Sequence, residues 1–122
     1  MDSAETAAVR ERLLADEQQT VEQIDALDER ARELQSPDEV AFSSDASRAD
    51  DAPLAVEREK ELALRRTLQQ RLRDVRSALG KLEQGTYGRC EACGQPISPQ
   101  RLRAQPHAAL CINCQAKMER AR

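Results

Sequence analysis

The sequence has very few aromatic residues: one Tyr, one Phe and no Trp among 122 residues. Because aromatic side chains supply much of the apolar area in thick cores, this composition argues against a large globular core. No apolar run approaches the roughly 18 residues that a membrane-spanning helix needs, so we expect no membrane association. The start of the chain, MDSAETAAVRER, lacks the basic and apolar regions of a secretory signal. These absences predict a cytoplasmic protein that is either an elongated helical chain or partly disordered.

Charge is distributed unevenly along the chain. Residues 1–52 contain 15 acidic and 5 basic side chains, a net charge of −10. Residues 53–84 have a net charge of +3, and residues 85–122 have a net charge of +4. Since an acidic surface repels phosphates, direct DNA binding is not expected. The basic residues near the end form either a solvated face or a contact for an acidic surface.

Two long segments have the apolar spacing of α-helices. The first covers residues 3–35, and Asp2 with Glu5 forms an N-cap pattern at its start. Its predicted apolar stripe, which Glu17 and Thr20 interrupt, is Leu14, Val21, Ile24, Leu27, Ala31 and Leu34. The second covers residues 53–84 and has the narrow stripe of a coiled coil: Leu64, Leu68, Leu72, Val75, Leu79 and Leu82.

The two helices are predicted to form an antiparallel hairpin. Pro37 is expected to end the first helix, and the polar residues 43–51 connect it to the second. Residues 1–84 would then be a coiled-coil hairpin, with its tip at about 36–52, and the chain would be a monomer. Pairing of the stripes with a second chain is the alternative. The tip is acidic, because it has one basic residue, Arg48, and five acidic residues: Asp38, Glu39, Asp45, Asp50 and Asp51.

Four cysteines stand in two CxxC pairs that 17 residues separate: Cys90, Cys93, Cys111 and Cys114. Each pair can direct two sulfurs at one metal, and two pairs complete a tetrahedral site. One structural zinc ion is therefore predicted, in preference to disulfides or a redox pair. Gly94 supplies the open backbone of the first turn, and Pro96 and Pro99 predict an irregular loop between the pairs.

The fold class that follows is all-α with a small zinc finger. The finger, residues 85–122, includes a short C-terminal helix, and Tyr87 is expected to pack the hairpin base against it. The single histidine, His107, is interpreted as a surface residue because the cysteines suffice as ligands. No nucleophile–base pair is evident, so the chain is not expected to be an enzyme.

The finger resembles the DksA/TraR family. The resemblance rests on Gly85-Thr-Tyr-Gly-Arg-Cys-Glu-Ala-Cys-Gly94, Ile97, and the pattern Arg101-Leu-x-Ala-x-Pro-x-Ala-x-Leu-Cys-Ile-x-Cys-Gln115. It implies a regulator that binds bacterial RNA polymerase. The hairpin would enter the secondary channel, and its tip would modulate initiation near the active site. The finger would dock on the channel rim, with Arg101 and Arg103 as candidate contacts.

The resemblance also identifies tip residues and a nucleotide site. The family's tip motif, Asp-x-x-Asp-x-Ala, corresponds here to Ser47, Asp50 and Ala52, with Asp45 and Asp51 close in sequence. Some family members bind guanosine tetraphosphate (ppGpp) through three basic residues, and the corresponding positions here are Asp74, Gln105 and Gln115. Because neutral amides and a carboxylate cannot replace cations around a polyphosphate, weak or absent ppGpp binding is predicted.

Two other functions fit parts of the sequence. A zinc-ribbon module that binds nucleic acid would use the basic residues of the finger: Arg89, Arg101, Arg103 and Lys117. The acidic first half and the shortage of stacking aromatics argue against it. A structural coiled-coil adaptor would share the stripes but would give no reason for the acidic tip.

Overall fold

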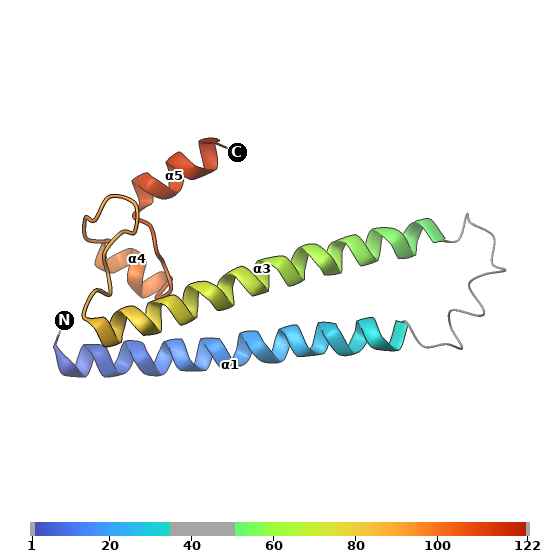
Figure 1. Ribbon diagram of the computed structural model, residues 1–122, viewed down its shortest axis with the longest axis horizontal. Coiled ribbons are helices and arrows are strands. Elements are labelled where there is room, and N and C mark those ends of the chain that lie inside the picture. Colours follow the sequence, from blue (N-terminus) through green and yellow to red (C-terminus); the bar gives the residue numbers. More distant parts are fainter. Residues whose placement is uncertain (1, 35–50, 122) are drawn as a thin grey trace. The chain divides into compact units, whose positions relative to one another are not determined.

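The computed structural model describes residues 2–34 and 51–121 (Figure 1). Helix α1 covers Ser3–Leu34 and helix α3 covers Asp51–Gln84. Two shorter helices follow, α4 at Pro99–Ala104 and α5 at Ile112–Ala121. At 1.5 Å per residue, the 34 residues of α3 extend for about 51 Å. The all-α architecture and the two long helices confirm the prediction from apolar spacing, and no helix in the described ranges is apolar enough over a sufficient length to cross a bilayer.

Helix α1 begins where the capping pattern places it. The backbone N–H of Glu5 donates to Asp2 Oδ1 at 2.8 Å. This bond satisfies one of the four amide groups that lack a partner at a helix N-terminus. The predicted N-cap is therefore confirmed.

The chain divides into two compact units, one of Met1–Gln18 with Arg71–Arg122 and one of Gln19–Gln70. The first unit contains the start of α1, the end of α3 and the whole finger. Its core consists of Leu13, Val75, Ala78 and Leu82. Val9, Leu79 and Tyr87 are partly buried against this core. The apolar positions that α3 was predicted to bury near its end are therefore confirmed.

The predicted stripe of α1 was wrong at its beginning. Leu13 is fully buried, whereas Leu14 is 48% exposed. Thr20, interpreted from sequence as an interruption, is only 1% exposed. Positions 13, 20, 24 and 27 share one face of a helix, and position 14 points about 100° away from Leu13. Geometry therefore places Leu13 and Thr20 on the buried face, although Leu14 and Leu13 are chemically identical.

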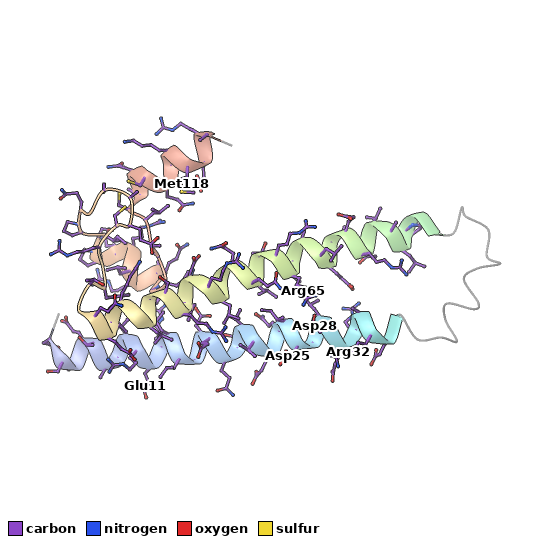
Figure 2. All side chains as sticks on the ribbon, in the orientation of Figure 1. Glu11, Asp25, Asp28, Arg32, Arg65 and Met118 are labelled. Carbon is purple, nitrogen blue, oxygen red and sulfur yellow. The ribbon has the colours of Figure 1, made fainter. Side chains whose placement is uncertain are left out.

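In the second unit, charged groups accompany a thinner apolar stripe. Leu68 is buried, but Leu64, predicted as part of the stripe, is 49% exposed. Asp28 of α1 and Arg65 of α3 form an ion pair at 3.0 Å (Figure 2), and Arg30 of α1 and Glu61 of α3 form another at 3.1 Å. The second partner moves back along α3 as the first advances along α1, so the two segments run antiparallel. Partly exposed ion pairs of this kind contribute about 1 kcal/mol or less each.

The sequence predicted an irregular loop between the cysteine pairs, but part of this loop forms helix α4. Ser98 is the N-cap of this helix: its side chain accepts a hydrogen bond from the backbone N–H of Arg101 at 3.2 Å. Pro99 occupies the first turn, where its missing N–H costs nothing. The Ser-Pro pair is thus a helix start, which the sequence interpretation overlooked here.

Candidate metal centre and its attachment to the hairpin base

The four cysteine sulfurs converge on one point. All four Sγ atoms lie within 4.8 Å of one another, and none of the cysteines forms a disulfide. The Sγ atoms of Cys93 and Cys111 are 3.8 Å apart. A tetrahedron with Zn–S bonds of about 2.3 Å has edges of about 3.8 Å, so this spacing fits zinc. The cysteines are the ligand set of one structural zinc ion, as the sequence predicted.

Backbone turns hold the first cysteine pair in place. The N–H of Gly94 donates to the carbonyl of Cys90 at 2.9 Å, and the N–H of Cys90 donates to the carbonyl of Gln95 at 2.9 Å. Gly94 has a φ of +76°, which residues with a side chain rarely adopt. The predicted need for glycine after the second cysteine is therefore confirmed.

The second pair lies at the start of α5. Cys111 directly precedes the helix, and its carbonyl accepts the N–H of Gln115 at 2.9 Å. Cys114 follows within the first turn. Amide groups at a helix N-terminus favour the thiolate form of cysteine, which is the form that binds zinc.

Repulsion between neighbouring thiolates opposes ionisation of the whole cluster. Hydrogen bonds from backbone groups, that of Cys111 first, lower the pKa of Cys90 to about 6. The side chains of Cys111 and Cys90 raise the pKa of Cys114 to about 12. A divalent ion would offset the mutual repulsion of four thiolates, so the chemistry of the donors also fits zinc. When bound, the ion supplies a rigid crosslink and no open catalytic position.

Contacts within the finger and with the hairpin base hold the finger in place. The hydroxyl of Tyr87 donates to the carbonyl of Pro106 at 2.8 Å. Burial raises the pKa of Tyr87, and the charge of Arg12 opposes this rise. Lys81 Nζ, near the end of α3, lies 2.6 Å from Glu91 Oε1. The predicted role of Tyr87 in packing the base against the finger is confirmed.

One attachment had no signal in the sequence. Arg12 Nη1 donates to the carbonyl of Arg103 at 2.5 Å, across 91 positions of the chain. No spacing rule links two residues so far apart, and Arg12 looks in the sequence like any charged residue on a helix.

His107 is partly buried, so its interpretation as a surface residue was wrong. Its side chain is 19% exposed, and its Nδ1 lies 3.8 Å from Asp16 Oδ2. Burial first, and then the charge of Arg71, lowers the pKa of His107 below its usual value. His107 is not among the clustered ligands. It belongs to the surface that joins the finger to the helices of the first unit.

The candidate rim contacts differ from each other. Arg101 is partly buried, and its Nε donates to the carbonyl of Leu110 at 2.9 Å, so it braces the loop before the second cysteine pair. Arg103 is exposed. A contact of either residue with a partner stays a prediction, and geometry favours Arg103 as the freer of the two.

The positions that correspond to the ppGpp site lie on three elements. Asp74 is in α3, and its charge raises the pKa of His107 against the dominant effects. Gln105 is the C-cap of α4. Gln115 is in α5, where its Nε2 donates to Glu119 at 3.1 Å. Weak or absent ppGpp binding stays a prediction.

Most of the predicted tip lies outside the described residues. This applies to Asp38, Glu39, Asp45, Ser47, Arg48 and Asp50. Asp51 and Ala52 begin α3, but their side chains are not described. The roles of these residues therefore rest on the sequence alone.

Comparisons with known proteins agree with the metal centre. The model of the prokaryotic dksA/traR C4-type zinc finger matches residues 85–120. General stress protein 16O of Bacillus subtilis (strain 168) is 35% identical over 81 residues, which are 66% of this chain and 50% of that protein. RNA polymerase-binding transcription factor DksA of Caulobacter vibrioides (strain NA1000 / CB15N) is 36% identical over 75 residues, 62% of this chain and 53% of that protein. The chain thus spans about half the length of these curated relatives.

One solved structure is similar over nearly the whole chain. It is the structure of transcription factor DksA2 from Pseudomonas aeruginosa, with a TM-score of 0.75 and 30% sequence identity. The similarity covers 99% of this chain and 88% of that one. The finger and the long helices are therefore shared with one group of proteins, and this chain belongs to the DksA/TraR family.

Proposed function

We propose that this chain regulates transcription by binding bacterial RNA polymerase through the secondary channel. The observation that carries the proposal is the first unit, in which a four-cysteine finger is fixed to the base of two long helices. Relatives with this finger are named as RNA polymerase-binding transcription factors. A finger attached in this way is a suitable anchor, because it fixes the direction in which the helices leave the docking surface.

The acidic tip is the proposed acting part. Helix α3 is about 51 Å long, which is long enough to place a tip far from a docking site at the finger. The predicted tip motif retains Asp50 and Ala52 but has Ser47 at its first position. Carboxylates near the polymerase active site would act electrostatically on its catalytic metal ion or basic loops. The stability of initiation complexes would change as a result.

The first test is capture of purified polymerase by the zinc-loaded protein. We expect capture to fall when a competitor that occupies the secondary channel is added, because the two would share one entrance. The control is a competitor that binds elsewhere on the polymerase, which should leave capture unchanged. Capture that persists at saturating channel competitor would contradict the proposed route of entry.

The second test is Asp50→Asn. Asn caps a helix about as well as Asp, so stability should stay within about 0.5 kcal/mol of wild type. We expect polymerase capture to be retained and the effect on promoter output to fall severalfold. Asp50→Ala provides the comparison, because it removes the charge and also a side chain that the sequence alone predicts as a helix N-cap, worth about 1 kcal/mol. A wild-type promoter response for Asp50→Asn would show that the carboxylate at this position does not act.

A further inference from the structure

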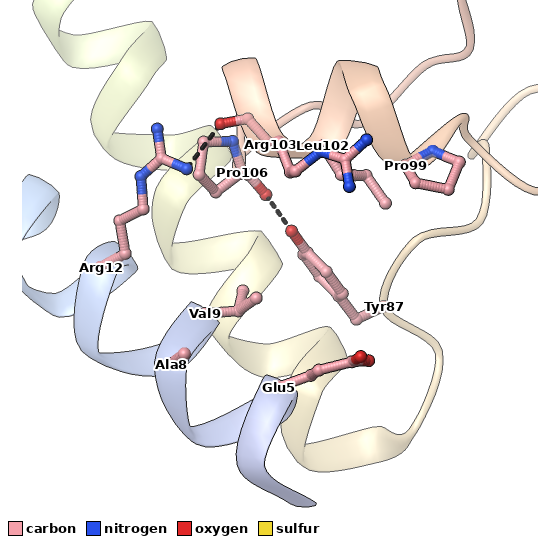
Figure 3. Close-up of a pocket in the computed structure, with 9 residues that line it drawn as sticks. All are labelled: Glu5, Ala8, Val9, Arg12, Tyr87, Pro99, Leu102, Arg103 and Pro106. Carbon is pink, nitrogen blue, oxygen red and sulfur yellow. Dashed lines mark hydrogen bonds between the residues drawn. The ribbon is translucent and has the colours of Figure 1, made fainter. Parts of the chain in front are cut away.

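A groove on the first unit is separate from the zinc site. Its volume is about 560 Å³, within the range of small-molecule sites. The start of α1 forms one side, α4 and the residues after it form another, and Tyr87 lies between them (Figure 3). The lining residues are Glu5, Ala8, Val9, Arg12, Tyr87, Pro99, Leu102, Arg103 and Pro106.

Most of the lining is apolar and held in place. Tyr87 is fixed by its hydrogen bond to the carbonyl of Pro106 and by packing against the core. Leu102 lies beside Gly88, where an added Cβ would come within 3.4 Å of Leu102 Cδ1. A surface of this kind favours a ligand with a flat or aliphatic apolar body.

Two arginines line the groove at separate places. Arg12 is positioned by its bond to the carbonyl of Arg103, and only its Nη1 takes part in that bond. The guanidinium of Arg103 has no partner among the described residues, and the residue is exposed. Figure 3 shows the two guanidinium groups on opposite sides of Pro106, with that of Arg103 toward Leu102 and Pro99, and the Glu5 carboxylate apart from both. The lining therefore carries two positive groups and one negative group, each at its own place.

We propose that this groove binds an amphipathic organic anion, a small molecule with an apolar body and one carboxylate or sulfonate group. The anionic group would lie at Arg103, whose exposed guanidinium can donate charge-assisted hydrogen bonds. The apolar body would lie against Tyr87 and Leu102. Glu5 leaves the lining with a net charge of +1, which favours a single negative charge over a polyphosphate. None of the three positions that correspond to the ppGpp site lines the groove.

The experiment uses two fluorescent probes with the zinc-loaded, full-length chain. The first is 8-anilino-1-naphthalenesulfonate, which carries the required anion. The second is N-phenyl-1-naphthylamine, which has nearly the same apolar body without the charge. We expect the first probe to bind at one saturable site, and more tightly than the second.

Three variants locate the site. Arg103→Gln should weaken binding of the anionic probe about tenfold, the usual cost of losing one charge-assisted contact, and leave the neutral probe unchanged. Glu5→Gln should strengthen binding of the anionic probe about twofold to threefold, again without effect on the neutral one. Arg10→Gln removes an exposed charge of α1 that does not line the groove, and should change neither.

A gain in binding of the anionic probe alone, as expected for Glu5→Gln, cannot arise from a loosened fold, because a loosened chain would bind both probes better. Equal changes for both probes in Arg103→Gln, or an effect of Arg10→Gln as large as that of Arg103→Gln, would overturn the proposal. Absence of saturable binding by wild type would also overturn it. The probe measurements contain no polymerase, so they are independent of polymerase capture, in which Arg103 has its own predicted role as a rim contact.

Discussion

At the scale of single residues, position on the helix decides burial more than chemistry does. Leu13 and Leu14 are neighbours of the same type, yet one is fully buried and the other is 48% exposed. Thr20 is buried although its side chain is polar. Hydrophobicity alone placed Leu14 on the buried stripe and left Thr20 out of it. The 3.6-residue period, counted from the buried Leu13, places Thr20 on the same buried face and Leu14 off it.

A matched pair of variants tests this assignment. Leu13→Ala should lower the free energy of unfolding by about 3 kcal/mol, because it leaves a cavity among Val75, Ala78 and Leu82. Leu14→Ala should change it by less than about 0.5 kcal/mol. Urea unfolding followed by circular dichroism at 222 nm, with zinc present, measures both. Equal losses for the two variants would mean that α1 is rotated relative to the face described here.

At the scale of elements, the sequence predicted the long helices well and the short one poorly. The predicted span 3–35 matches the start of α1 and ends one residue late, and the predicted span 53–84 starts two residues late and matches the end of α3. Long periodic segments average over many positions, so single errors such as Leu14 do not move their bounds. Helix α4 has only six residues and no buried ones, so periodicity carried no signal and only the Ser98-Pro99 start was available.

The metal site was equally predictable, for a different reason. Ligand type and spacing are fixed by coordination chemistry, so Cys90, Cys93, Cys111 and Cys114 were assigned without any knowledge of the fold. The residues that attach the finger to the helices follow no such rule. Only Tyr87 was predicted, whereas Arg12 and His107 act across the chain through contacts that no local pattern encodes.

At the scale of the whole molecule, zinc and the hairpin base stabilise the finger together. The described finger residues bury few apolar side chains, among them Cys90 and Ile97, and α4 and α5 bury none. A segment with so little buried area depends on the free energy of metal binding to fold. The link between the two parts can be observed directly, because Tyr87 is the only Tyr and the chain has no Trp.

Removal of zinc with a chelator should therefore change the environment of Tyr87 while leaving much of the long helices intact. In the zinc-loaded protein, burial holds the pKa of Tyr87 above its ordinary value of 10.0. The stability that the buried neutral Tyr87 contributes is therefore complete at pH values below its pKa in the unfolded chain. It is lost as the pH rises through the higher pKa of Tyr87 in the folded protein. We expect tyrosinate absorbance near 295 nm to appear at a lower pH after chelation, and added zinc to restore the original titration. The helical signal at 222 nm should fall by much less than it does on full unfolding. Titration of Tyr87 at the same pH with and without zinc would contradict a finger that depends on its metal and packs against the hairpin base through Tyr87.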